Sequence, residues 1–314
     1  MKICIKVFYS KIQTYIKGFS MIKNFIFLIF IILFFNSCEF NNNKKIKISI
    51  TTWIGYTPLL YAKEKDWLDP FNIKLVNVVS LSENVNIYKS GNSDAYVGTQ
   101  YEYKLIHEQN KNLIPIMIFN KSNGGDAILS NLSIDKLIKS DEVIDAYLEI
   151  DSVNSILLED FLKSNNLQNR IINYINEDQS NISRLNAKDT LNPTIITTYI
   201  PYNKILENNS FVELSSTKDN SNLLIIDAMY TTQDFYYKNK ETFIELKKLV
   251  DKAIENLKNN PKEFYETVSP YLVNTSYEDF ISSIDTIIWL NKDISEEISN
   301  KLQNSNFKTK DLIR

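Results

Sequence analysis

Hydrophobic and polar residues follow two different rhythms along this chain. From residue 46 onward, short segments with a period of two predict strands, and segments with apolar residues three or four apart predict helices between them. This alternation is typical of α/β layers built on a largely parallel sheet. We expect strands near residues 45–50, 72–79, 95–98, 114–119, 126–129, 142–149, 194–199, 211–214 and 223–226. Helices are expected near residues 58–64, 83–89, 102–110 and 152–164.

Two later segments carry the clearest apolar patterns. Residues 223–226 are apolar throughout, as in a strand buried on both faces, and Asp227 is expected to end that strand. Beyond Thr231 the chain is predicted to be helical. Its apolar positions form a single stripe made of Phe243, Leu246, Val250, Ile254 and Leu257.

A different pattern precedes residue 46. Residues 25–35 are all apolar and follow a positively charged stretch that begins at Met21. Their length fits the hydrophobic part of a signal peptide, about 7–15 residues, better than a membrane span of about 20. The run leads into Ser37-Cys38, which resembles the lipobox of bacterial lipoproteins, although Phe35 replaces the usual leucine. A single transmembrane anchor is the alternative.

We therefore interpret residues 1–37 as a lipoprotein signal peptide, with Met21 as a candidate true start. Cys38 would carry the lipid, including palmitate, and residues 38–45 would form a tether to the membrane surface. Removing residues 1–37 takes away five lysines and no acid, so the net charge changes from −3 to −8. The exported part would retain no free thiol, because Cys4 lies within the signal peptide and Cys38 carries lipid.

Composition narrows the possible functions further. The 314 residues are 44% hydrophobic and 23% charged, which is ordinary for a globular protein. The acidic balance argues against a nucleic-acid-binding protein, which usually has a concentrated basic face. His107 is the single histidine, and we expect it on the surface without a chemical role. No metal site and no cofactor are predicted.

Four segments resemble the substrate-binding proteins of ABC importers in the nitrate, sulfonate and taurine group, which also includes binders of pyrimidine precursors. The segments are Trp53–Ala62, Lys65–Leu68, Tyr88–Ala95 and Asn123–Ile128. Within the second, Asp66 stands where that family usually has glycine. Pro201-Tyr202 and the helical tail resemble the family more weakly.

The resemblance implies a type II periplasmic-binding-protein fold, with two α/β lobes joined by two crossing strands and a ligand held between the lobes. Lobe one is expected to comprise residues 46–128 and 223–314, and lobe two residues 129–222. The crossings would lie near residues 126–130 and 223–227. Ligands of such folds bind beyond the carboxyl ends of strands, which agrees with the pattern of loops.

Candidate ligand-binding residues follow the predicted strands or flank a crossing. They are Trp53, Gly55, Tyr56, Ser82, Glu83, Thr99, Gln100, Asn123, Asp151, Ser152, Asn154, Tyr199, Tyr202 and Asp227. Several have a purely structural alternative. Ser80 to Glu83 also fit a helix N-cap with an acid in the first turn. Asp151 also fits a simple N-cap, and the aromatic residues could pack in the core.

The charges near the predicted cleft favour a ligand with a nitrogen group. The only arginines are Arg170, Arg184 and Arg314, and none lies in a predicted cleft loop, so no arginine fork is available for a sulfonate. Aromatic and acidic residues dominate there instead, with Glu102 among the acids, which suits an amine or a polar heterocycle. An anion held by lysines and backbone amides is the alternative.

The function implied by the resemblance is that of a monomeric, non-enzymatic solute-binding lipoprotein of the cell envelope. It would capture a small ligand in the periplasm, or on the outer side of the cytoplasmic membrane, and deliver it to the ABC permease subunits. An enzyme resembling the pyrimidine-precursor synthase of the same fold is disfavoured, because it would need clustered cysteines and histidines. A ligand sensor without transport remains an open alternative.

Overall fold

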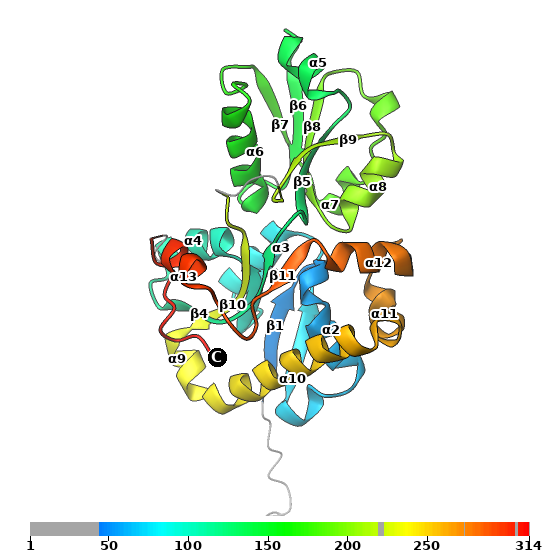
Figure 1. Cartoon of the computed structure of the whole chain (residues 1–314). Coiled ribbons are helices and arrows are strands. Elements are labelled where there is room, and N and C mark those ends of the chain that lie inside the picture. Colours follow the sequence, from blue (N-terminus) through cyan, green and yellow to red (C-terminus); the bar gives the residue numbers. More distant parts are fainter. Residues whose placement is uncertain (1–43, 219–222, 273, 305–306, 314) are drawn as a thin grey trace, which may run out of the picture. The chain divides into compact units, whose positions relative to one another are not determined.

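The computed structural model describes residues 44–218, 223–272, 274–304 and 307–313 (Figure 1). The proposed signal peptide and Cys38 lie outside the described residues. Residues Lys45–Arg314 form one compact unit. Within the described ranges, no helix is long and apolar enough to cross a membrane.

The first sheet has six strands in the order β11-β4-β10-β3-β1-β2. They are β1 (Ile46–Ile50), β2 (Ile73–Asn77), β3 (Ala95–Thr99), β4 (Leu113–Ser122), β10 (Ile226–Thr232) and β11 (Ile287–Trp289). β1 runs parallel to β2 and β3, whereas β10 is antiparallel to β3 and β4. The sheet is therefore mixed, and the expectation of a largely parallel sheet was wrong for its β10, β4 and β11 side.

The second sheet has five strands in the order β7-β6-β8-β5-β9. They are β5 (Asp126–Ser130), β6 (Ile144–Leu148), β7 (Ile172–Asn176), β8 (Thr194–Tyr199) and β9 (Val212–Ser216). β6 is parallel to β7 and β8, and β5 is antiparallel to β8 and β9. We propose that each sheet is the core of one lobe, and we call the parts around them lobe one and lobe two.

The first change of sheet falls between Ser122 and Asp126, because β5 pairs entirely within the second sheet. This is a few residues before the boundary at 128 that the sequence suggested. The predicted position of the strand by which the chain returns to the first sheet was also wrong. The apolar residues 223–225 precede β10 instead of forming it, and Asp227 is the second residue of the strand, not its last. Asp227 pairs there with Thr99 and Asn120.

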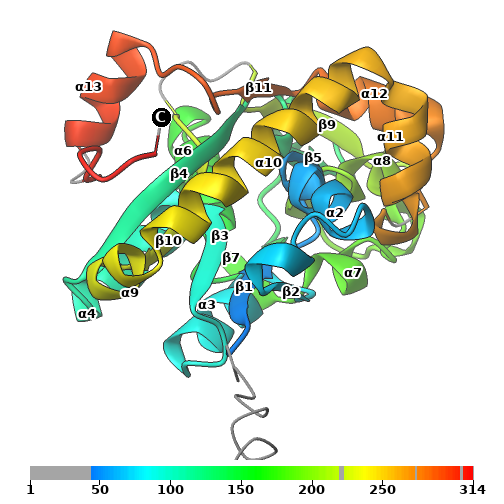
Figure 2. The same ribbon diagram turned by 90° about the horizontal axis from the view of Figure 1, so that it is seen from below.

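Helices cover both sheets. Those of lobe one are α2 (Thr57–Glu64), α3 (Leu81–Lys89), α4 (Gln100–Gln109), α9 (Gln233–Lys238), α10 (Lys240–Asn259), α11 (Pro261–Val268), α12 (Tyr277–Ile284) and α13 (Glu296–Asn304). Those of lobe two are α5 (Ile134–Lys139), α6 (Val153–Ser164), α7 (Gln179–Ile182) and α8 (Tyr202–Asn208). The apolar stripe predicted for the tail is buried along α10, which Figure 2 shows crossing the first sheet beside α2.

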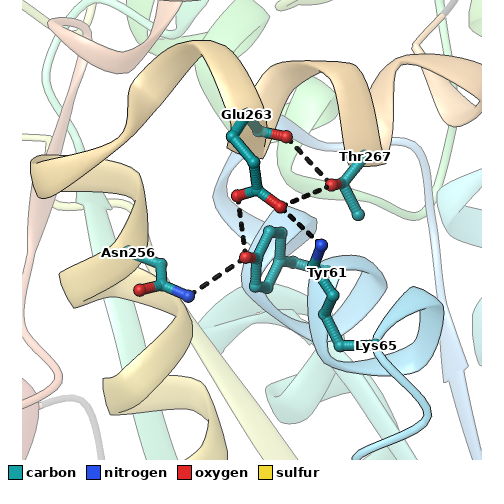
Figure 3. A network of polar contacts seen from close by, with 5 residues as sticks. All are labelled: Tyr61, Lys65, Asn256, Glu263 and Thr267. Carbon is teal, nitrogen blue, oxygen red and sulfur yellow. Dashed lines mark hydrogen bonds and ion pairs between the residues drawn. The ribbon is translucent and has the colours of Figure 1, made fainter.

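A polar network joins α2 to α10 and α11 (Figure 3). The Tyr61 hydroxyl donates to Glu263 Oε2 at 2.8 Å and accepts from Asn256 Nδ2 at 3.0 Å. Lys65 pairs with the same carboxylate, and the Tyr61 ring stacks on Phe264 with centroids 4.5 Å apart. These contacts fix the position of α2, the helix that follows the loop after β1.

Candidate functional site

A small, partly open space lies where loops of the two lobes meet. Its volume is about 20 Å³, which is room for a water-sized group. We call it the interlobe cavity. It is lined by Thr51, Trp53, Tyr56, Leu81, Thr99, Asp126, Val153, Tyr199, Ile225 and Asp227. The loop that follows β1, the ends of β3 and β8 and the start of β10 supply most of these residues, as expected for binding near strand ends.

Aromatic rings form one wall of the cavity. Trp53 follows β1 and meets Tyr199 of lobe two edge to face, with ring centroids 6.0 Å apart. Its indole N–H donates to Asn120 Oδ1 at 3.3 Å. Gly55 permits this packing, because an added Cβ would lie 2.2 Å from Asn120 Nδ2 and 2.4 Å from Trp53 Nε1. A side chain at residue 55 would therefore displace the wall.

Asp227 is held against that wall. The Tyr56 hydroxyl, on the short 3₁₀ helix Ile54–Tyr56, donates to Asp227 Oδ1 at 2.5 Å. Both side chains are almost fully buried. Burial raises the pKa of Asp227 well above its ordinary value, and the nearby carboxyls of Asp126 and Glu102 raise it further. The hydroxyl of Tyr56 partly offsets this by stabilising the carboxylate.

Asp126 opens β5 on the other side of the cavity and is 4% exposed. Its Oδ2 atom is buried and has no hydrogen-bond partner in the described part of the chain. Burial raises the pKa of Asp126 to about 7, the Ser122 hydroxyl opposes this shift, and the charge of Glu102 adds to it. Thr51 Oγ1 is a second buried oxygen on the cavity lining that has no partner among the described residues. The site therefore holds an unused carboxyl oxygen and an unused hydroxyl, which can both donate and accept.

Glu102 joins the two lobes from lobe one. Its Oε2 accepts from the Thr99 amide at 2.7 Å, completing the capping box that starts α4. Its Oε1 accepts from the Val153 amide, at the N-terminus of α6 in lobe two, at 2.7 Å. Burial raises the pKa of Glu102, and these hydrogen bonds lower it.

Glu149 makes the reciprocal contact from lobe two. Its Oε2 accepts from the Leu81 amide, at the N-terminus of α3 in lobe one, at 2.6 Å. Burial raises its pKa to about 7, and hydrogen bonds from the Leu81 and Gln179 amides oppose the shift. Each lobe thus places a carboxyl on a helix N-terminus of the other, where the helix dipole favours negative charge.

Seven of the predicted site residues lie at or beside the cavity. Trp53, Tyr56, Thr99, Tyr199 and Asp227 line it. Gly55 lies behind the wall, and Tyr202 packs edge to face on Tyr199 with centroids 5.6 Å apart. Their role in ligand binding stays a proposal.

The other predicted site residues have different positions. Glu83 is exposed and accepts from the Val79 amide at 2.9 Å, and Ser82 lies beside Ser80, which is the N-cap of α3. Asp151 is exposed, at a left-handed turn. Gln100 ties α4 to the first residues of the β10 crossing by accepting from the Ile226 amide at 2.8 Å. The Asn123 amide donates to the Thr286 carbonyl at 2.8 Å.

Two further predicted residues support Glu149 from behind. Ser152 is the N-cap of α6 and donates to the Glu149 carbonyl at 2.6 Å. Asn154 Oδ1 accepts from the Glu149 amide at 3.4 Å and from Gln179 Nε2 at 3.0 Å. Neither Ser152 nor Asn154 is among the residues that line the cavity.

The sequence interpretation missed Asp126, Glu149 and Thr51 as site residues. Asp126 follows Gly124-Gly125, and this step was noted only as part of the crossing. Gly125 also allows the close approach of Trp53, because a Cβ there would lie 2.4 Å from the indole. Glu149 follows β6 at the carboxyl end of a parallel strand, which is the signal that identifies it.

Other parts of the described chain offer fewer groups for binding or catalysis. His107 is half-buried, stacks on Tyr103 and makes a hydrogen bond to the Leu113 carbonyl through Nδ1 at 3.2 Å. Two larger hollows, of about 120 and 380 Å³, are lined by lobe one residues alone. In the part of the chain that the structure describes, no three His, Cys, Asp or Glu side chains are grouped to hold a metal ion.

In sequence, the chain matches no protein-family model and no curated protein. In structure, it resembles a ligand-binding component of an ABC-type import system from Staphylococcus aureus with zinc bound (TM-score 0.63, 13% identity, 86% of this chain and 96% of that chain). It also resembles the alkanesulfonate-binding protein SsuA from Xanthomonas axonopodis pv. citri bound to MOPS (TM-score 0.65, 11% identity, 85% and 95%).

A third similar structure is a Candida albicans gene product that was described as having the generic periplasmic-binding-protein fold (TM-score 0.65, 14% identity, 86% of this chain and 98% of that chain). The chain therefore has the periplasmic-binding-protein fold, which confirms the predicted fold class.

Proposed function

We propose that this protein is the solute-binding component of an ABC importer. It would capture a small polar molecule between its two lobes and deliver it to the permease. The observation that carries the proposal is the interlobe cavity, to which both lobes contribute aromatic and carboxyl groups. Ligand sites of this kind are enclosed, largely apolar and fixed by a few convergent polar groups.

The fold supports the same reading, because structures with this fold include ligand-binding components of import systems. Binding would close the lobes, and the contacts of Glu102 and Glu149 across the lobes are suited to hold the closed form. We infer no catalytic role. The synthase-like alternative needs cysteine and histidine together, and after removal of residues 1–37 only Cys38 and His107 remain.

The binding proposal is tested by ligand screening of the purified full-length protein. Amines, sulfonates and pyrimidines are added singly, and the melting temperature and tryptophan fluorescence are recorded. A ligand should raise the melting temperature by mass action, and enclosure should alter Trp53 emission. Trp53→Phe is the control that separates Trp53 from Trp67 and Trp289. If no compound of any class changes the melting temperature or the fluorescence, the result would contradict solute binding.

We also infer that Cys38 carries a lipid and anchors the protein in the cell envelope as a monomer. The support is the apolar run 25–35 followed by Ser37-Cys38 and a polar tether. Cys38→Ser should leave an unprocessed precursor, visible by its greater mass on a gel of the membrane fraction. A Cys38→Ser protein that matures and partitions like the wild type would contradict lipidation.

A further inference from the structure

The helix N-termini beside the interlobe cavity already hold carboxyl groups of the chain itself. The Leu81 amide of α3 donates to Glu149, and the Val153 amide of α6 donates to Glu102. Leu81 and Val153 both line the cavity. Helix N-termini are the groups that most readily bind a sulfonate or a carboxylate, because they combine free amides with a positive dipole end. A bound anion would have to displace one of these two carboxyls.

The remaining polar groups on the cavity lining are carboxyls and hydroxyls. Asp126 Oδ2 and Thr51 Oγ1 are buried without hydrogen-bond partners within the described ranges, and Asp227 accepts from Tyr56. A buried carboxyl oxygen that has no donor is costly, so a donor on a ligand would gain the full value of satisfying it. None of the ten lining residues is lysine, arginine or histidine. The cavity therefore has carboxyls but no cation of its own to balance them.

The aromatic wall suits the same kind of ligand. Trp53 and Tyr199 meet edge to face, and Tyr56 lies on the same wall. Aromatic faces attract cations, and this attraction strengthens when water is excluded. At about 20 Å³ the cavity has room for one water-sized group, which fits an ammonium nitrogen, and the rest of a ligand would lie outside it. Burial is the main cause that raises the pKa of Asp126 and of Asp227; the charge of Glu102 adds to both shifts, and that of Asp126 adds to the shift of Asp227.

We infer that the interlobe cavity selects ligands with a primary ammonium or amidinium head group, which Asp126 and Asp227 bind between the aromatic side chains. This inference rests on the proposed solute-binding function and specifies its ligand class. A sulfonate is disfavoured in this cavity, because the Val153 and Leu81 amides already donate to Glu102 and Glu149.

The test compares four probes of equal chain length on the purified full-length protein: n-butylammonium, butanamidinium, butane-1-sulfonate and butan-1-ol. Binding is measured by calorimetry and by the shift in melting temperature at constant ionic strength. At least one of the two cations should bind, and the sulfonate and the alcohol should not. Asp126→Asn should weaken cation binding at least tenfold, whereas Asp141→Asn, in an exposed loop before β6, should bind as the wild type does.

A second readout distinguishes recognition by charge from an effect on folding. Binding of a cation should release protons near neutral pH, because the pKa of Asp126, about 7, falls when a positive charge is placed beside it. Calorimetry in buffers of different ionisation enthalpy measures this release, which should shrink in Asp126→Asn. The groups that face Asp126 are Glu102, Asp227, Tyr101 and Tyr199. Of these, Asp227 and Glu102 remain titratable in the variant.

Each other outcome overturns the inference. Sulfonate binding without cation binding would reverse the charge preference and leave solute binding intact. Equal binding of the alcohol and a cation would show that charge is not recognised. If neither cation binds, the head-group assignment is wrong, and the broader screen then decides whether solute binding itself stands. Cation binding that is unchanged in Asp126→Asn would also remove the site from this cavity.

Discussion

The stability of this protein should depend on pH through Asp126. The carboxyl is 4% exposed and its pKa is raised to about 7, against an ordinary value of 3.8. The difference is about 3 pKa units, and at about 1.4 kcal/mol per unit it corresponds to as much as about 4 kcal/mol. Asp126→Asn keeps the shape of the side chain and removes its titration.

The sign follows from which state holds the proton. Between about pH 4 and pH 7, folded Asp126 is protonated and unfolded Asp126 is ionised, so unfolding releases a proton. The free energy of unfolding of the wild type should therefore fall as pH rises through this window. The contribution is fully present below about pH 4 and lost above about pH 7. Glu149, whose pKa is also about 7, adds a similar slope to both proteins.

The assay is urea unfolding followed by far-UV circular dichroism at about pH 4.5, 5.5, 6.5 and 7.5. The quantity to compare is the free energy of unfolding of Asp126→Asn minus that of the wild type. It should grow by up to about 1.4 kcal/mol per pH unit, so the variant gains in relative stability towards neutral pH. Asp141→Asn is the matched control and should show no such growth. A difference that stays constant within about 0.5 kcal/mol would refute the reasoning.

Three further substitutions test the architecture around the site. Gly55→Ala should lower the free energy of unfolding by about 1–3 kcal/mol, measured by urea unfolding, because its Cβ would lie 2.2 Å from Asn120 Nδ2; an unchanged value would contradict the tight packing. Tyr61→Phe should cost about 1–2 kcal/mol in the same assay, through loss of the Glu263 and Asn256 hydrogen bonds. Glu149→Ala removes one contact between the lobes and should increase the radius of gyration in solution scattering, since a charge-assisted hydrogen bond of about 1.5–3 kcal/mol shifts an equilibrium about 10–100-fold. Glu159→Ala, exposed on α6, is its control, and equal radii would count against the contact.

Sequence patterns predicted helices and strands well where one face of the element is apolar and buried and the other is polar. The stripe along α10 is buried as expected, since a period of 3.6 residues leaves one apolar face to pack on the sheet. The start of β10 was misplaced for the opposite reason. Residues 223–225 are apolar, but they form the crossing, whereas the strand itself contains Asp227, Tyr230 and Thr231, all buried. Asp227 and Thr231 are hydrogen-bonded to residues distant in sequence, and a hydrophobicity pattern does not show such contacts.

Two short segments show why the site was only partly predictable. Ser80 to Glu83 and Thr99 to Glu102 have the same spacing, with a hydroxyl residue three positions before a glutamate. Both start a helix, and both hydroxyls accept from the third amide or its neighbour. Glu83 is exposed, whereas Glu102 is 2% exposed and reaches the Val153 amide of lobe two. That partner is 51 positions away in sequence, so only the folded arrangement distinguishes the two acids.

The preference for a positively charged head group therefore rests on different residues from those the sequence suggested. Glu83 and Asp151 are exposed, so they add little attraction at the cavity because solvent screens them. Glu102 is hydrogen-bonded at two helix N-termini, and most of its charge is already stabilised there. Asp126 keeps a free buried oxygen, and Asp227 has the Tyr56 hydroxyl as its neighbour. Selectivity for a cation is consequently concentrated on Asp126, where a ligand donor meets an acceptor that nothing else in the described chain satisfies.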